Sequence, residues 1–313
     1  MKVFTKFTQG FVKVFFVLIF IIAFLFISIS LDIEDESFKK VDTNKSLLIG
    51  SFNIQIFGES KMSKPNVVAS LVEILSRYDI VLIQEIRDKK GEAIIKLLHR
   101  LNIATGNKYD LVLSDRLGNS NSKEQYAFIY NKYKLEVLKV YNYLDKGNKF
   151  EREPFSVKFK YLDKDFILSG IHVDPDLVFE ELNELDEAIE NINTILSDFD
   201  LVLMGDFNAD CNYISEKDLK KLDIFIKYSW LIDSKTDTTT SKTDCAYDRI
   251  IVTDSLILNV KSSRVYHFDK EQGLNKKETK RVSDHYPVEF LLDFNWKVQL
   301  FSWTFLYYWL LLI

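Results

Sequence analysis

Two short segments place residues that could do chemistry at the ends of apolar runs. Met204–Asn208 (MGDFN) closes one such run, and Ser283–Pro287 (SDHYP) precedes another. Short polar side chains at strand ends project from a rigid sheet edge, so residues that are distant in sequence can share one cleft. A cleft that holds carboxylates and imidazoles suits metal-assisted attack of water on a phosphodiester.

Oxygen-donor side chains recur at such positions. They are Asn53 after Leu47–Phe52, Glu85 after Ile80–Gln84, Asp206 and Asn208 after Leu201–Met204, and Asp284 before Pro287–Leu292. Carboxylate and amide oxygens are hard ligands, which suit Mg²⁺, Mn²⁺ or Ca²⁺ rather than zinc. Any one of these residues alone is more often a surface or capping residue. Their recurrence at strand ends favours a shared site.

The chain has 4 histidines, and two of them lie beside these runs. His172 ends the run Phe166–Ile171, and His285 lies in the SDHYP segment. Imidazole titrates near neutrality, so two such groups can supply the general base and the general acid that phosphodiester hydrolysis needs. We take His99, in an amphipathic segment, and His267, in a polar stretch, as structural residues.

Motifs for other mechanisms are absent from the sequence. It contains no Gly-x-Ser-x-Gly nucleophile motif, no phosphate-binding glycine loop and no His-Glu-x-x-His. Direct attack by activated water therefore fits better than a covalent intermediate.

The elements that would position these residues are short apolar or alternating runs. We predict strands at Leu47–Ile54, Ile80–Gln84, Tyr126–Tyr130, Phe155–Tyr161, Phe166–His172, Leu201–Met204, Arg249–Val252 and Val288–Leu292. Several are apolar on both faces, as in buried sheets. No linker divides residues 46–294, which indicates a single domain.

Helical periodicity is clear in two places. A helix is predicted after Ser63 and Pro65, with an apolar face made by Val67, Leu71, Ile74 and Leu75. A longer acidic helix is predicted over Leu177–Leu196, with Leu182, Leu185, Ile189, Ile192 and Ile195 on its apolar side. Strands interspersed with helices mean an α/β or α+β fold. Periodicity leaves open whether the sheets form one layer or two.

The charge balance argues against a general polyanion-binding surface. The net charge is −5, and without residues 1–30, which carry three lysines and no acid, it is −8. A nucleic-acid substrate remains compatible with this charge, since a hydrolase can use divalent ions and a few local arginines.

Both ends of the chain are apolar. Residues 1–30 carry Lys2, Lys6 and Lys13 before the run Val14–Ile29, which is typical of a signal peptide cleaved after Ser30. An uncleaved signal anchor is the alternative. Residues 31–45 then form a short polar lead-in, and either arrangement would translocate the body of the chain.

The second apolar end is residues 295–313. Its run Leu300–Ile313 is short for a membrane span, and we find no convincing lipid-attachment site before it. Its aromatic residues would suit a membrane interface. An extension without a role is the alternative. We expect a secreted protein, or one held at a membrane by either hydrophobic end.

The chain has 2 cysteines, Cys211 and Cys245. In a cytosolic enzyme they would most often be unrelated buried thiols. In a translocated chain, one pair with no remainder indicates one disulfide.

Taken in order, these segments closely resemble the deoxyribonuclease I family within the endonuclease/exonuclease/phosphatase superfamily. The segments that match are Ser51–Met62, Ile74–Asp88, Lys123-Glu124, Arg152–Pro154, His172, Met204–Cys211, Cys245–Arg249 and Ser283–Pro287. The resemblance runs from about Leu47 to Leu292. It implies an α/β (α+β) four-layer sandwich, with two packed mixed β-sheets flanked by helices. It also implies a DNA endonuclease of little sequence specificity that leaves 5′-phosphate and 3′-hydroxyl ends.

The resemblance implies a role for each matching residue. His172 resembles the general acid, assisted by Glu124, and His285 resembles the general base, oriented by Asp248. The ligands of Mg²⁺ or Mn²⁺ would be Glu85, Asp206, Asp284 and Asn53, with Asn208 binding the ion or the phosphate. The sequence does not decide which histidine is the acid and which is the base.

Further family positions concern DNA and calcium. Arg87 and Arg152 match contacts to the backbone or minor groove of double-stranded DNA, which gives little base discrimination. A structural Ca²⁺ would be bound by Asp237, Thr239, Ser241 and Thr243. Cys211 and Cys245 match a family disulfide. We expect a monomer.

The sequence departs from the family pattern in three places. Ser122 stands where a Tyr is frequent, so a stacking contact is missing. Residues 141–150 lack the cysteines of a small extra loop, which puts a second calcium site in doubt. Phe155 follows Arg152–Pro154, where actin-sensitive members tend to have a small residue, so we expect weak or no inhibition by actin.

Two other functions remain open on the sequence alone. One is hydrolysis of a lipid head group, for which the hydrophobic tail is the only support. The other is a binding module without activity, whose signature would be loss of a histidine or a metal ligand. No such residue is lost.

Overall fold

The computed structural model describes residues 46–119 and 122–294. The predictions for residues 1–30, 31–45 and 295–313, including both hydrophobic ends, lie outside this part of the chain. Within the described residues, no helix combines the length and the apolar character that a membrane crossing requires.

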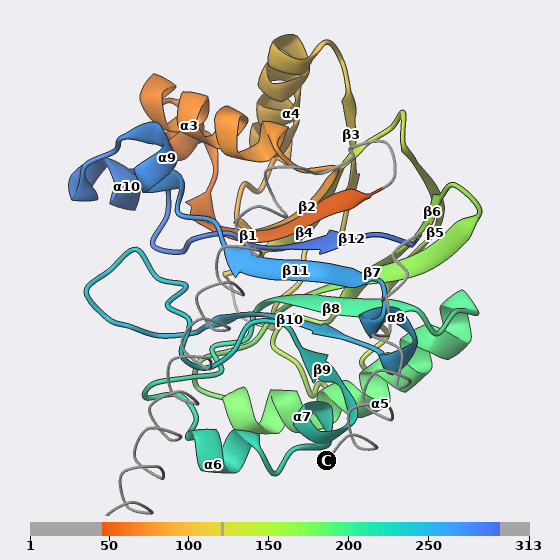
Figure 1. The fold of residues 1–313 in the computed structure, drawn as a ribbon. Helices are drawn as coiled ribbons and strands as arrows, with labels where there is room; N and C mark the ends of the chain where they lie inside the picture. Colours follow the sequence, from red (N-terminus) through yellow and green to blue (C-terminus); the bar gives the residue numbers. More distant parts are fainter. Residues whose placement is uncertain (1–45, 120–121, 295–313) are drawn as a thin grey trace, which may run out of the picture. The chain divides into compact units, whose positions relative to one another are not determined.

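The described chain builds two six-stranded mixed sheets (Figure 1). The first has the order β11 (Val260–Val265), β12 (Val288–Leu292), β1 (Leu47–Phe57), β2 (Ile80–Ile86), β4 (Gln125–Asn131) and β3 (Tyr109–Leu113). The second has the order β5 (Leu135–Asn142), β6 (Phe155–Tyr161), β7 (Lys164–His172), β8 (Leu201–Asp206), β10 (Asp248–Val252) and β9 (Ser229–Trp230). In each sheet one central pair is parallel, β1 with β2 and β7 with β8.

Helices cover the outer faces of both sheets (Figure 1). Over the first sheet lie α3 (Pro65–Ser76), α4 (Glu92–Thr105), α9 (Phe268–Gln272) and α10 (Lys276–Val282). Over the second lie α5 (Val178–Leu196), α6 (Glu216–Leu219) and α7 (Asp223–Lys227). The short helices α2 (Glu59–Met62) and α8 (Asp254–Ile257) complete the set. The four-layer sandwich with two packed mixed sheets is therefore confirmed.

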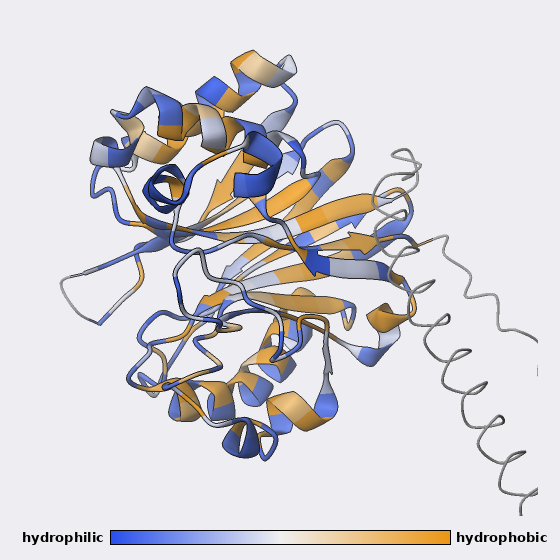
Figure 2. Cartoon of the chain, turned by 60° about the vertical axis from the view of Figure 1, so that its left-hand side comes forward, coloured by the Kyte–Doolittle hydropathy of each residue, from blue (hydrophilic) through white to orange (hydrophobic). Residues whose placement is uncertain are grey.

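The core lies where apolar strand faces meet (Figure 2). The ring of Phe128 in β4 packs against Phe155 and Phe159 in β6, with ring centroids 5.8 and 6.0 Å apart, which joins the two sheets. The sheets approach closely at Gly170, where a Cβ atom would lie 2.7 Å from a methyl group of Leu82. A second apolar cluster fills the space between the second sheet and α5.

Both predicted helices are present. In α3, Pro65 takes the first turn, and Val67, Leu71, Ile74 and Leu75 are buried as expected. In α5, Leu182, Leu185, Ile189 and Ile192 are buried. The assignment of Ile195 to the buried side is wrong, because its side chain is 40% exposed near the end of the helix.

All eight predicted strands are present, but the prediction missed four others. The structure adds β3, β5, β9 and β11, and these four strands form the outer edges of the two sheets. It also extends the first strand from Ile54 to Phe57, through an irregularity in its pairing with β2. Residues Gln55 and Ile56 within this bulge have φ of 46° and 49°, in the left-handed region.

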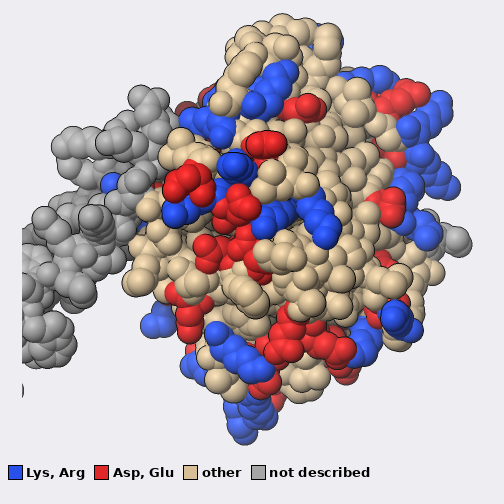
Figure 3. Space-filling view, turned by 90° about the vertical axis from the view of Figure 1, so that its right-hand side faces the viewer, with Lys and Arg blue, Asp and Glu red and all other residues tan. Residues whose placement is uncertain are grey.

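Charges of both signs are mixed on one face of the described chain (Figure 3). On the face shown in Figure 3, Lys and Arg side chains lie next to Asp and Glu side chains. This face therefore offers no continuous basic surface for a polyanion.

Candidate active site

Strand pairing brings three of the predicted residues together on the second sheet. His172 ends β7 and pairs with Asp206 at the end of β8, and Asp206 pairs with Asp248 at the start of β10. Gly205 makes this possible, because it has φ 149° and a Cβ atom there would lie 1.9 Å from the Ile171 carbonyl oxygen. Only glycine allows β8 to approach β7 so closely just before Asp206.

His172 is held by a buried carboxylate. Its Nδ1 lies 2.9 Å from Oε2 of Glu124, whose residue is 1% exposed. The other oxygen of Glu124 accepts from Arg87 at 2.8 Å. Burial would raise the pKa of Glu124, but His172 and the nearby arginines, Arg152 and Arg87, outweigh burial and hold this pKa below its usual range. Glu124 is therefore an anion that fixes the ring and its tautomer.

His285 has the same arrangement with a different partner. Its Nδ1 lies 2.7 Å from Oδ2 of Asp248, which is fully buried. Burial disfavours a charged imidazole, but the carboxylates of Asp248 and Asp206 outweigh it and hold the pKa of His285 well above its usual range. The Asp248 backbone N–H donates to Oγ1 of Thr238 at 3.1 Å, which fixes the strand that carries the acid.

The free ring nitrogens of the two histidines meet at one carboxylate. Nε2 of His172 lies 3.6 Å from Oδ2 of Asp206, and Nε2 of His285 lies 3.5 Å from the same oxygen. The two Nε2 atoms are thus no more than about 7 Å apart, a span that a single phosphate could bridge within hydrogen-bond reach.

The first sheet contributes the remaining acids. The amide of Asn53 donates to Oε1 of Glu85 at 3.0 Å and to Oδ2 of Asp206 at 3.1 Å. Glu85 Oε2 accepts from the Ile56 backbone N–H at 2.8 Å. Asp284 enters from the segment before β12, and its Oδ1 lies 3.8 Å from Nε2 of His285.

This donor set fits a hard divalent cation. Glu85 and Asp206 are buried, and Oδ1 of Asp284 is a buried oxygen without a hydrogen-bond partner among the described residues. Ligand atoms of Asp206, Asp248 and His285 also lie within 4.8 Å of one another. Of these three residues, His285 and Asp248 are already hydrogen-bonded to each other at 2.7 Å. Asp206 belongs both to this cluster and to the predicted ligand set of Glu85, Asp206, Asp284 and Asn53.

Asn208 holds Asp206 through its backbone. Its backbone N–H donates to Oδ1 of Asp206 at 3.1 Å, and its side-chain amide donates to the Val173 carbonyl at 2.9 Å. Asn208 is 7% exposed, so its side chain is already engaged within the protein.

The two predicted DNA-contacting arginines differ in exposure. The Arg87 side chain is 33% exposed and also lies 3.3 Å from Oε2 of Glu85. The Arg152 side chain is 8% exposed, and its Nε donates to the His172 carbonyl at 2.9 Å. One terminal nitrogen of Arg152, Nη2, is buried and has no hydrogen-bond partner within residues 46–119 and 122–294.

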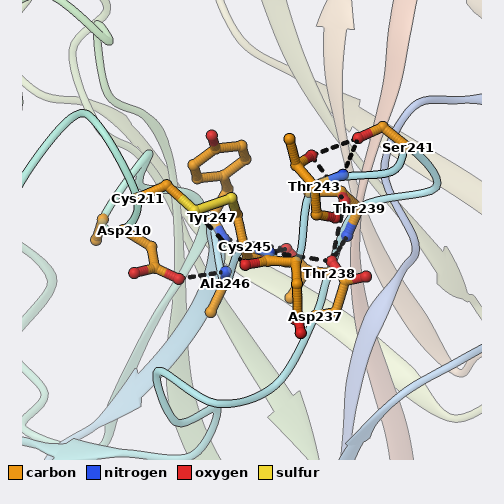
Figure 4. The surroundings of a disulfide bond; sticks show 12 residues. Asp210, Cys211, Asp237, Thr238, Thr239, Ser241, Thr243, Cys245, Ala246 and Tyr247 are labelled. Atoms are coloured by element: carbon orange, nitrogen blue, oxygen red, sulfur yellow. Dashed lines mark hydrogen bonds between the residues drawn. A yellow bond between two sulfur atoms is a disulfide. The ribbon is translucent and has the colours of Figure 1, made fainter.

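The predicted calcium loop is bonded to itself (Figure 4). Asp237 Oδ1 accepts from the Thr239 backbone N–H at 2.9 Å and from the Cys245 N–H at 3.2 Å. The Thr239 hydroxyl donates to the Thr243 carbonyl at 2.7 Å, and the Ser241 and Thr243 hydroxyls are hydrogen-bonded. The four predicted ligands therefore lie together.

The predicted disulfide between Cys211 and Cys245 is present (Figure 4). It lies just after the segment with Asp206 and just before Asp248. The Asp210 carboxylate accepts from the Ala246 N–H at 2.7 Å beside it.

Residues outside the predicted set also position the site. Gln84 is fully buried, donates to the Ile171 carbonyl at 2.7 Å and accepts from the Asp206 N–H at 3.1 Å, so it ties the two sheets together. The Tyr126 hydroxyl accepts from the His172 N–H at 2.8 Å. Gln84 and Tyr126 are end residues of the predicted strands Ile80–Gln84 and Tyr126–Tyr130, and Gln84 also lies in the matching segment Ile74–Asp88, but neither observation indicated these contacts.

The two histidines taken as structural lie elsewhere. His99 is exposed on α4. His267 precedes α9, and its ring centroid lies 4.7 Å from that of Tyr286.

Comparisons with known proteins identify relatives of this chain. The model of the Endonuclease/Exonuclease/phosphatase family matches residues 50–285. Bovine Deoxyribonuclease-1 is 39% identical over 260 residues, which cover 79% of this chain and 92% of the relative. Human Deoxyribonuclease gamma is 37% identical over 263 residues, which cover 79% of this chain and 86% of the relative.

Solved structures share the fold at low identity. An endonuclease/exonuclease/phosphatase family protein from Bacteroides thetaiotaomicron has a TM-score of 0.55 at 18% identity, covering 80% of this chain and 98% of its own. The human Nocturnin catalytic domain has a TM-score of 0.57 at 16% identity, covering 80% and 95%.

Proposed function

The chain belongs to the deoxyribonuclease I family within the endonuclease/exonuclease/phosphatase superfamily, and on this premise we propose that it is a divalent-metal-dependent DNA endonuclease. Its products would be 5′-phosphate and 3′-hydroxyl ends, and its sequence preference would be weak. The observation that carries the proposal is the approach of both histidine Nε2 atoms to one oxygen of Asp206.

The two histidine–carboxylate pairs suit proton transfer in opposite directions. In each pair Nδ1 faces a buried carboxylate, so Nε2 is left for the reacting atoms. We assign His285 as the base that takes a proton from water while the water oxygen bonds to phosphorus. Its raised pKa would fall with a divalent cation held beside it by Asp206 and Asp284, which would favour the neutral ring that a base needs. His172 then gives a proton to the departing 3′-oxygen as the phosphorus–oxygen bond breaks. After the reaction His285 carries the proton taken from water and His172 lacks one, and proton exchange with solvent returns both rings to their starting states.

The cation would be held by Glu85, Asp206, Asp284 and Asn53. Mg²⁺ or Mn²⁺ bound there would neutralise charge that develops on the phosphate. The side-chain amide of Asn53 donates to both Glu85 and Asp206. These two acids are therefore held close together before DNA binds. Asn208 keeps Asp206 in place by its backbone N–H.

DNA would be held by a few local contacts. Arg87 is 33% exposed beside Glu85, and the Arg152 side chain, although largely buried, is 8% exposed. Guanidinium groups are well suited to phosphate oxygens. Contacts to phosphates and to the minor groove carry little base information, which accounts for weak sequence preference.

Location and partners follow the same premise. The Cys211–Cys245 disulfide fits an oxidising compartment, so we propose passage through the secretory pathway. We further propose a monomer with a Ca²⁺ ion at the loop of Asp237, Thr239, Ser241 and Thr243. Weak or absent inhibition by actin is expected from Phe155, and equimolar monomeric actin that abolished activity would refute it.

Plasmid nicking is the experiment that tests the function. Supercoiled plasmid with Mg²⁺ and Ca²⁺ should be converted to the open circle, and ligase should reseal the nicks because the ends are 5′-phosphate and 3′-hydroxyl. A chelator should stop the reaction. Folded protein that leaves the plasmid intact across neutral pH would reject the proposal, and activity on lipid vesicles alone would favour a lipid head group as substrate.

A further inference from the structure

Lys61 is a buried lysine that the proposed reaction does not use. It lies on α2 and is 7% exposed. Burial lowers the pKa of its ammonium group to about 8, against the attraction of Asp284 and Glu85. A buried charged group is unfavourable unless it is paired or hydrogen-bonded, so its partners show what it does.

The ammonium group joins two segments beside the active site. Its Nζ donates to the carbonyl of Ile54 in β1 at 2.7 Å and to the carbonyl of Val282 at 2.8 Å. Ile54 lies beyond Ser51, the last residue of β1 that pairs with β12. Val282 is the last residue of α10, and the final carbonyls of a helix have no partner within the helix. Lys61 therefore satisfies two carbonyls that belong to different elements.

Two further hydrogen bonds run beside these contacts. The Ser283 hydroxyl donates to the Asn53 carbonyl at 2.6 Å, and the Gln55 side chain donates to Oδ2 of Asp284 at 2.7 Å. Residues 53–55 are thus tied to residues 282–284, and we call this set of contacts the β1–α10 clasp. His285 follows directly, and its backbone N–H donates to the Ser283 hydroxyl at 3.1 Å.

We propose that Lys61 is a positioning residue for the nuclease reaction, which holds Asp284 and His285 in place against Asn53 and Glu85 through the clasp. The inference rests on the proposed function. Lys61 contacts neither imidazole, so it acts through the segment that carries them. A displacement of about 1 Å at reacting groups costs roughly 100-fold in rate, which is the size of effect to expect.

The test compares three variants with the wild type in plasmid nicking. Lys61→Met keeps the length of the side chain but cannot donate, and Lys61→Arg keeps the charge and the donors. Lys64→Met removes an equal charge three residues away, from an exposed position. Melting temperature, kcat, KM for DNA and the pH profile of kcat are measured for each variant.

We expect Lys61→Met to lower kcat by about 30- to 100-fold with KM for DNA within about threefold. Its acidic pH limb should move by about half a unit or more, because the carboxylates around His285 are displaced. Lys61→Arg should recover most of kcat, and Lys64→Met should match the wild type. A merely structural role would lower the melting temperature and leave kcat and the pH limb of the folded enzyme unchanged.

Several outcomes would overturn the proposal. Wild-type kcat and pH profile in folded Lys61→Met would do so, with the nuclease function intact. If that variant does not fold, Lys61→Gln replaces it, because its shorter amide should not span both carbonyls and should show the same fall in kcat. Failure of every Lys61 variant to fold would make the residue structural and reject positioning. An inactive wild type would instead reject the nuclease function on which this inference rests.

Discussion

His172 and His285 point their Nε2 atoms at the same oxygen, Oδ2 of Asp206, from 3.6 and 3.5 Å. The two rings come from different sheets, since His172 ends β7 and His285 precedes β12. Each ring is fixed on its other nitrogen by a buried carboxylate. The site is therefore nearly symmetric, because two imidazoles, each held by a buried carboxylate, face one acid.

Removal of either imidazole should nearly abolish nicking. His172→Ala and His285→Ala are each expected to lower kcat by about 10²- to 10⁴-fold, the range for loss of a general acid or base. His99→Ala is the matched control, because His99 is exposed on α4, and it should keep wild-type activity. Initial rates on supercoiled plasmid are the measurement. Near-normal activity in either of the first two variants would contradict the assignment.

Asp248→Asn should lower the pKa of His285 and weaken the contact that fixes its tautomer. The carboxylate raises the pKa of His285, so its loss should lower that pKa. The asparagine can also hold the wrong tautomer, which should lower kcat by about 10³- to 10⁴-fold. NMR titration of the His285 ring, before and after substitution, measures the shift. A pKa that rises or stays unchanged would show that Asp248 is not the dominant partner.

Loss of a predicted metal ligand should be visible as a changed cation requirement. Glu85→Gln removes one anion and should raise the Mg²⁺ concentration for half-maximal activity by about 10- to 100-fold. Glu92→Gln, an exposed acid at the start of α4, should leave this concentration unchanged. Mg²⁺ titrations of the nicking rate give both values, and equal curves for wild type and Glu85→Gln would remove Glu85 from the ligand set.

Glu181 should make stability fall as pH rises. Burial raises its pKa to about 7 in the folded chain, from an ordinary 4.5, although it accepts from the backbone of Glu151. Between these values the unfolded chain binds fewer protons than the folded chain, so the free energy of unfolding decreases with pH, by about 3 kcal/mol at most from this residue.

Substitution isolates this contribution. Glu181→Gln should flatten the pH dependence of the unfolding free energy between pH 4.5 and 7, and Glu180→Gln, an exposed neighbour on the same turn, should not. Denaturant unfolding of both variants across this range is the measurement. An unchanged slope in Glu181→Gln would assign the pH dependence to other groups.

The disulfide should contribute both stability and activity. Cys211 and Cys245 are 34 positions apart, so their removal as a pair of serines should cost about 3–4 kcal/mol in the chain-entropy model. Activity should fall more steeply with temperature, because the bridge joins the segments of Asp206 and Asp248. Denaturant unfolding with and without reductant tests this, and a loss under about 1 kcal/mol would contradict it.

The predicted strands and the missed strands differ in burial. The eight that periodicity revealed are the inner strands, such as β2 and β8, in which every residue is buried. The four that it missed are edge strands, such as β5, whose residues are mostly exposed or half-buried. An edge strand has one neighbour and more solvent, so its composition is mixed and a local pattern does not distinguish it from a loop.

Resemblance to a family identified the chemical residues, but it did not reveal their supports. Gln84, Tyr126 and Lys61 each bond to a backbone group that is between 46 and 221 positions away in the sequence. Each is an ordinary residue in its local segment. Its role depends on the backbone group to which its side chain is hydrogen-bonded, and a single sequence does not show which group that is.

By itself, the sequence determined the two histidines and the oxygen donors at strand ends, the inner strands that carry them and the two principal helices, while the resemblance added Glu124 and Asp248. Those features depend on residue type and on local periodicity, since burial on both faces of a strand leaves an apolar run. Only the tertiary structure decided that both imidazoles face one carboxylate, that Arg152 is largely buried and that Lys61 ties β1 to α10. These are contacts between elements, and their geometry is set by how two twisted sheets pack rather than by the residues next to them in the chain.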